Sequence, residues 1–107
     1  MTNFGDRERA EEAHFAMEEE MQFRIHARRN RLLGQWAAER MGLSAAEAES
    51  YAKSVVQADF EEAGDEDVIR KLLGDLTAAG VETSEAEIRL ALEAKQVEAR
   101  RALMGEA

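Results

Sequence analysis

Apolar and polar residues follow one another along the chain with the spacing of helices. Apolar positions recur every three or four residues in four segments, and no run of alternating β-branched residues predicts a strand. The longest segment covers residues 6–41, has no glycine before Gly34, and would form one helix of about 50 Å. The chain contains no proline to interrupt it. The pattern therefore predicts an all-α protein organised around one long helix.

The two halves of this long segment differ in their apolar pattern. The second half has a broad apolar face, typical of a helix in a bundle, made by Ile25, Leu32, Leu33, Trp36, Ala37 and Met41. We expect Arg28, Arg29 and Arg31 to point away from that face. The first half has only a narrow stripe of alanines and methionines, with Phe15 and Phe23 on a second face. Such a segment gains little from burial, so we expect it to project from the bundle.

Three shorter helices follow the long one. Capping-box patterns, in which a serine is followed three residues later by a glutamate, begin at Ser44 and Ser84. They open helices that we expect over residues 44–63 and 84–103, and a third apolar stripe predicts a shorter helix over residues 65–79. The connecting loops are only a few residues long, which favours antiparallel neighbours. We therefore predict a four-helix bundle with a long first helix and a mobile N-terminal arm.

The helix lengths also divide the chain. A bundle about 20 residues high needs only the second half of the long helix. We therefore expect residues 1–20 to form an arm that either protrudes or folds back and that need not be ordered in the free protein, and residues 21–107 to form the helical bundle.

Charge is arranged in blocks along the chain. Residues 1–20 carry two basic and seven acidic side chains, a net charge of −5. Residues 21–40 carry five arginines and one glutamate, or +4, and residues 41–69 carry one lysine and eight acids, or −7. Such blocks indicate oriented electrostatic contacts, within the chain or with a partner. The total of −9 argues against a general nucleic-acid-binding protein, because phosphate contacts dominate that affinity.

The basic block supplies a candidate ligand or docking cluster, formed by Arg24, Arg28, Arg29 and Arg31. An acidic run with six carboxylates lies in residues 59–67. It is either a solvated helix end followed by an acid-rich helix start, or a docking surface for these arginines or for a partner. Both interpretations stay open at the level of sequence.

No residue pattern predicts catalysis, a metal site or a cofactor. The chain has no cysteine, and its one Glu-x-x-His pattern, Glu11 to His14, lacks the second copy that a di-metal site needs. The stretch from Gly74 to Gly80 lacks the lysine of a phosphate-binding loop. The first ten residues contain no apolar run, so we expect no secretory signal, and no run in the chain approaches 18 apolar residues. We expect a cytoplasmic protein that is not an enzyme and does not insert into the membrane.

Three segments carry a family resemblance. They read FGDRERAEEAHFAMEEEMQFR, ARRNRLLGQWAAERMGL and ADFEEAGDEDV. In these segments, and in order over essentially the whole chain, the sequence resembles the zeta subunit of alphaproteobacterial F-type ATP synthases, a family of small inhibitor subunits. The resemblance implies an inhibitor of ATP hydrolysis, built as a four-helix bundle with a mobile N-terminal arm.

The resemblance also implies a mechanism and partners. The arm would enter a catalytic interface between the alpha and beta subunits, fold there as a helix, and reach toward the gamma subunit, which blocks rotation in the hydrolytic direction. The inhibitory region falls on residues 2–20, and the contact residues expected in and beside it are Phe4, Arg7, Glu8, Phe15, Glu18, Glu19 and Phe23. We expect a monomer that lies peripheral to the inner membrane through the ATP synthase. The alternative is a helical regulatory or adaptor module that binds another protein or a nucleotide through residues 24–31.

Overall fold

The computed structural model of the chain consists of helices and describes residues 4–59 and 64–105, with side chains described from Glu18 onward. The helices are α1 (Phe4–Arg40), α2 (Ala45–Ala58), α3 (Glu66–Ala78) and α4 (Glu85–Leu103). Within the described residues there is no strand. The predicted all-α fold of four helices with a long first helix is confirmed.

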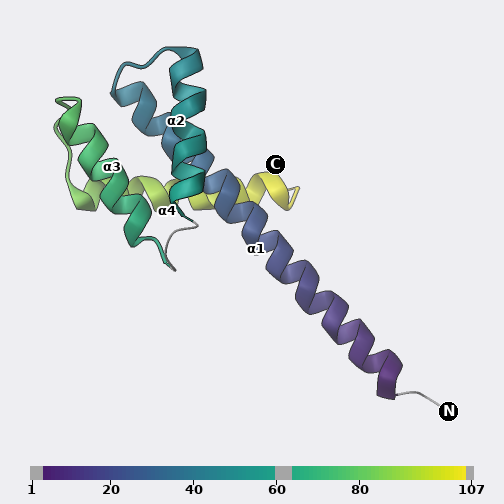
Figure 1. Cartoon of the computed structure of the whole chain (residues 1–107). Coiled ribbons are helices and arrows are strands. Elements are labelled where there is room, and N and C mark those ends of the chain that lie inside the picture. Colours follow the sequence, from purple (N-terminus) through teal and green to yellow (C-terminus); the bar gives the residue numbers. More distant parts are fainter. Residues whose placement is uncertain (1–3, 60–63, 106–107) are drawn as a thin grey trace.

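The shape of the molecule is set by α1. This helix has 37 residues, or about 55 Å, and the principal extents of the molecule are 68 × 30 × 24 Å. The other three helices gather around the C-terminal half of α1, whereas its N-terminal half projects away from them (Figure 1). Among the described side chains of α1, Ile25 is the first that is buried, with 2% exposed. The C-terminal half of α1 and the three shorter helices together form the body of the molecule. The N-terminal half of α1 projects from this body.

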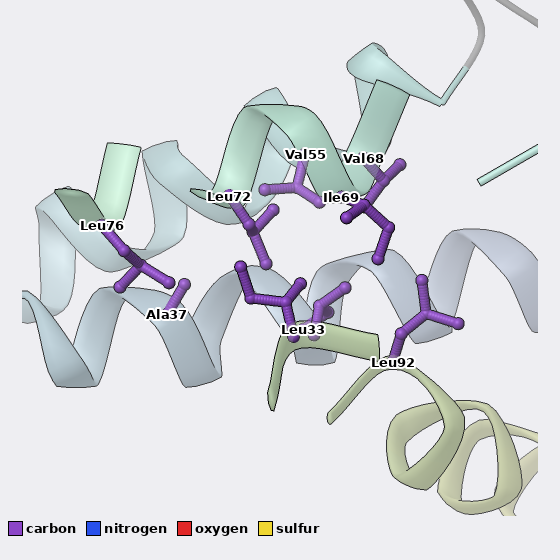
Figure 2. Close-up of a cluster of buried hydrophobic side chains, with 9 residues drawn as sticks. Leu33, Ala37, Val55, Val68, Ile69, Leu72, Leu76 and Leu92 are labelled. Atoms are coloured by element: carbon purple, nitrogen blue, oxygen red, sulfur yellow. The ribbon is translucent and has the colours of Figure 1, made fainter. Parts of the chain in front are cut away.

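A single apolar core joins the four helices. Its buried members are Leu33, Ala37, Val55, Val68, Ile69, Leu72, Leu76, Ile88 and Leu92, most of them labelled in Figure 2. Four of them repeat along α3 at helical spacing, which explains why this short helix folds against the others. Burial of a leucine, isoleucine or valine side chain stabilises a fold by about 1.5 to 3 kcal/mol. This core fixes the C-terminal half of α1 in the body.

Gly34 allows α1 and α2 to approach each other closely. A β-carbon at this position would lie 2.7 Å from the Ala52 α-carbon and 3.2 Å from a Val55 methyl group. Glycine inside a helix costs about 1 kcal/mol relative to alanine. The close packing of the two helices offsets that cost.

The first predicted capping box forms as expected. The Glu47 backbone N–H donates to the Ser44 hydroxyl (3.2 Å), and the Glu47 carboxylate accepts from the Ser44 backbone N–H (2.9 Å). The hydrogen bond from that backbone N–H is the main cause that lowers the pKa of Glu47. The start of α2 is therefore specified by local chemistry.

The second capping box is only half formed, which corrects the prediction. The Glu87 backbone N–H donates to the Ser84 hydroxyl at 3.2 Å. The Glu87 carboxylate instead pairs with Arg40 and accepts from Thr83 at 3.3 Å. An ion pair between α1 and α4 thus takes the place of the missing half of the capping box.

Helix α2 is shorter than predicted. It ends at Ala58, not near Ala63, and has 14 residues. Asp59 follows it at the C-cap position and lies close to Arg29 of α1.

Candidate partner-binding site

The arm residues expected to contact a partner lie along the projecting half of α1. Phe4, Arg7, Glu8 and Phe15 occupy positions on its helical backbone, and their side chains lie outside the described ones. The side chains of Glu18 and Glu19, which follow, are described and exposed. The structure therefore places the expected contact residues on one continuous helix.

The body stops covering α1 near Phe23. This side chain is 56% exposed, whereas Ile25, two residues later, is 2% exposed. A groove of about 520 Å³ lies here between α1 and the end of α4, and Met21, Arg100 and Met104 are among its lining residues. The end of α4 thus marks the transition from the projecting part of α1 to its packed part.

The four arginines of the predicted cluster do not form one site. Arg24 pairs with Glu20 one turn away, with 2.7 Å between Nη2 and Oε1, and both side chains are exposed. Arg28 and Arg31 are also exposed, and with Arg24 they line a groove between α1 and α2. Arg29 is different, because only 1% of it is exposed. The structure thus separates three exposed cations from one buried cation.

Sequence reasoning missed a fourth cation in that groove. Lys53 of α2 lies along the same groove as the three exposed arginines. No pattern in the sequence fixes the register of α2 against α1, so only the packing of the two helices could place Lys53 there.

Arg29 is a buried structural cation. Its Nε donates to Asn30 Oδ1 (3.0 Å), and its Nη1 donates to Gln96 Oε1 (3.1 Å). Its Nη2 lies 3.0 Å from Asp65 Oδ1 and 3.8 Å from Asp59 Oδ1. A buried guanidinium needs such partners, because the loss of water around an isolated charge is very costly. Arg29 therefore links α1 to α4 and to both ends of the segment that joins α2 and α3.

The expectation that Arg29 points away from the apolar face is wrong. Arg29 lies four residues after Ile25 and four before Leu33, so it belongs to their stripe of the helix. For Asp59 and Asp65, the interpretation of the acidic run as an internal docking surface for arginine is confirmed.

Arg40 ties the C-terminal end of α1 to the start of α4. Its guanidinium pairs with the Glu87 carboxylate, donates to the Glu82 carbonyl (3.3 Å), and lies 5.1 Å from the centre of the Trp36 ring. The hydrogen bond from Arg40 is the main cause that holds the pKa of Glu87 below its usual range. This end of α1 is thus held by charge as well as by apolar packing.

A second polar cluster joins α2 to α3. The Tyr51 hydroxyl donates to Asp75 Oδ2 at 2.7 Å, and Lys71 Nζ donates to the same oxygen at 3.0 Å. The Lys71 ammonium also lies 5.1 Å from the centre of the Tyr51 ring. Burial, and next the hydrogen bond to Asp75, raise the pKa of the Tyr51 phenol well above its ordinary range. These contacts tie α2 to α3.

The described residues offer neither a metal site nor a membrane span. Among the described side chains, those of residues 18–59 and 64–105, no group of three His, Cys, Asp or Glu is arranged to hold a metal ion. The helices of the same residues include none that is long and apolar enough to cross a bilayer. The surfaces that stand out are the projecting half of α1 and the basic groove beside it.

Known proteins resemble this chain in sequence and in fold. A family profile described as ATPase inhibitor subunit zeta matches residues 1–102. Among solved structures, one determined by solution NMR is 52% identical, covers 81% of this chain and 99% of its own, and superposes with a TM-score of 0.71. No curated protein sequence matches this chain.

Proposed function

Since the chain belongs to the ATPase inhibitor subunit zeta family, we propose that it inhibits ATP hydrolysis by an F-type ATP synthase through its N-terminal arm, residues 1–20. The family supports the inhibitory role. The arm as the inhibitory element is our proposal, and it rests on the geometry of α1.

One observation carries this proposal. The N-terminal half of α1 projects from a body that packs only against the C-terminal half (Figure 1). A helix of about 20 residues is about 30 Å long, which is enough to enter a cleft between two subunits while the body stays outside. None of the described side chains from Glu18 to Arg24 belongs to the core, and the length of this projection supports the proposal that it meets a partner.

In the proposed mechanism, the arm occupies a catalytic interface between alpha and beta subunits and reaches toward the gamma subunit. An interface that must change shape during hydrolysis cannot do so while a helix fills it, so rotation in the hydrolytic direction stops. Phe15 and Phe23 would anchor the helix, because buried aromatic side chains dominate many interfaces. Charged residues such as Arg7 and Glu18 would set its register.

The proposal also concerns the mobility of the arm in the free protein. A projecting helix is held mainly by its own backbone hydrogen bonds, and isolated helices of this length are marginally stable in water. We propose that residues 1–20 are mobile in the free protein and become ordered on binding. The protein would act as a monomeric, non-catalytic regulator in the cytoplasm, peripheral to the inner membrane through the ATP synthase.

The direct test is ATP hydrolysis by the purified catalytic head of the ATP synthase from the same source. The intact chain should inhibit hydrolysis, and a chain that lacks residues 1–20 should not. Circular dichroism and thermal melting of the shortened chain should show that the body is still folded. Equal hydrolysis rates with and without the intact chain would refute the proposed function.

A further inference from the structure

A groove with an apolar floor runs beside the exposed cations of α1. It has a volume of about 860 Å³ and lies between α1, the second half of α2 and the end of α4. Its floor is formed by Ala27, Leu32, Val56 and Leu103, all half-buried. The groove therefore leaves apolar surface accessible between packed helices, next to the projecting part of α1.

The rim of this groove is positively charged. Arg24, Arg28, Arg31 and Lys53 line it, and none of the described residues that line it is acidic. Arg24 has Glu20 as a partner. In the part of the chain that the structure describes, no carboxylate forms an ion pair with Arg28, Arg31 or Lys53. Such a concentration of cations is unexpected in a protein with a net charge of −9, and it indicates a surface that meets negative charge.

We propose that this groove binds an acidic amphipathic helix on the surface of the ATP synthase head, as a second contact beside the arm. This inference rests on the proposed function, which supplies the partner. The lining positions of α1 run from Phe23 to Gln35, about 18 Å or a little over three helical turns. An apolar floor with charged edges over that length fits a helix that lays its apolar face into a groove.

The arrangement of the cations favours a helix over a small anion. The three arginines are spread along about 10 Å of α1, so they do not converge on one point as the ligands of a phosphate would. The groove also begins at Phe23, directly after the arm on the same helix. A partner that holds the arm would therefore present its neighbouring surface to the groove. Attraction between opposite charges would speed the encounter of the two proteins.

The test measures binding of the full-length chain to the immobilised catalytic head. Arg28→Glu, Arg31→Glu and Lys53→Glu each reverse one charge of the groove. Arg101→Glu is the matched control, because Arg101 is an exposed arginine outside the groove and its reversal causes the same change in net charge. We expect each groove variant to lower the association rate about tenfold. The dependence of that rate on salt between about 0.05 and 0.3 M should also weaken.

The outcomes separate this inference from the proposed function. Groove variants with an intact arm should still inhibit ATP hydrolysis at saturating concentration. If they associate as fast as the Arg101→Glu control, the groove proposal is overturned and the inhibitory arm stands. If the unaltered chain neither binds nor inhibits the head, both proposals fall.

Two further measurements exclude other occupants. The first is an NMR titration with ATP. If micromolar ATP shifted the backbone amide signals of Arg28 and Arg31, the groove would be a nucleotide site and the proposal would be overturned. Self-association of the unaltered chain in sedimentation, lost in Arg28→Glu, would assign it to a second copy with the same consequence. Circular dichroism of each variant should match that of the unaltered chain, since all the altered residues are exposed.

Discussion

Arg29 of α1 reaches Asp65 at the start of α3, with 3.0 Å between Nη2 and Oδ1. The Arg29 side chain is 1% exposed and the Asp65 side chain 39% exposed, so the pair joins the interior of the body to its surface. The same guanidinium holds Gln96 of α4. One cation thereby links α1 to α3 and α4.

This pair predicts a large loss of stability on removal of the arginine. Arg29→Ala leaves a cavity and deprives two carboxylates of their cation. Because Asp59 and Asp65 keep some access to water, we expect a loss of about 2 to 4 kcal/mol, somewhat less than for a fully buried pair. Urea denaturation of the variant measures this difference. Arg28→Ala, one position earlier and exposed, is the control and should change stability by less than about 0.5 kcal/mol.

Gly34 and Gly74 predict opposite effects of the same substitution. Gly34→Ala would place a methyl group 2.7 Å from the Ala52 α-carbon, so the two helices must separate. Overpacking of this kind costs about 1 to 3 kcal/mol, which exceeds the helix propensity gained from alanine. An alanine β-carbon at Gly74, inside α3, would meet no atom within 4 Å. Gly74→Ala should therefore stabilise the protein by up to about 1 kcal/mol. Thermal melting measures both effects. Melting temperatures of the two variants that shifted in the same direction would contradict this account.

Features that depend on local sequence could be predicted, whereas features that depend on how the helices pack could not. Helical spacing and the Ser44 cap identified four helices, because those signals are local. Arg29 also occupies a position of the apolar stripe, but its charge predicts that the side chain is exposed to solvent. Its burial depends on carboxylates that are distant in sequence, and only the tertiary structure brings them close. Lys53 and Gly34 depend on the register of α2 against α1, which no local pattern encodes. The candidate arm was recognised as too long for its bundle, whereas the basic groove required the packed structure.

The raised pKa of Tyr51 predicts a loss of stability at alkaline pH. The ordinary value of this phenol is 10.0, so the unfolded chain releases the proton above about pH 10 while the folded chain retains it. The contribution of Tyr51 to stability is therefore fully present below pH 10 and declines as the pH rises further. Tyr51 is the single tyrosine of the chain, so the change in ultraviolet absorbance that accompanies tyrosinate formation reports on it alone. We expect the tyrosinate signal to appear together with unfolding.

The control for this prediction is Tyr51→Phe. Loss of the hydrogen bond to Asp75 should lower its stability at neutral pH by about 1 kcal/mol. Its stability should then fall less steeply above pH 10 than that of the unaltered chain. A tyrosinate signal that appeared near pH 10 in the folded protein would contradict the buried environment of Tyr51.

Hydrogen exchange tests the proposed mobility of the arm. Amides of residues 4–20 should exchange within about a hundredfold of the rate of an unfolded chain, because local opening there disrupts no core contact. Amides near Leu33 and Ala37, which are fully buried, should exchange only on global unfolding. On binding to the ATP synthase head, the arm should become protected. Equal protection along the whole of α1 in the free protein would show that the arm is already rigid.

An aromatic anchor on the arm predicts a large effect of one substitution on inhibition. Phe15→Ala should raise the concentration needed for half-maximal inhibition of ATP hydrolysis by roughly one to two orders of magnitude, because a buried aromatic contact contributes about 2 kcal/mol or more to an interface. Alanine is a better helix former than phenylalanine, so loss of the helix would not explain a weaker inhibitor. Leu90→Ala is the control, since Leu90 is a large apolar residue of α4 that is 67% exposed. Inhibition by Phe15→Ala that equals inhibition by Leu90→Ala would remove Phe15 from the proposed anchor and leave Phe23 as the aromatic residue to test next.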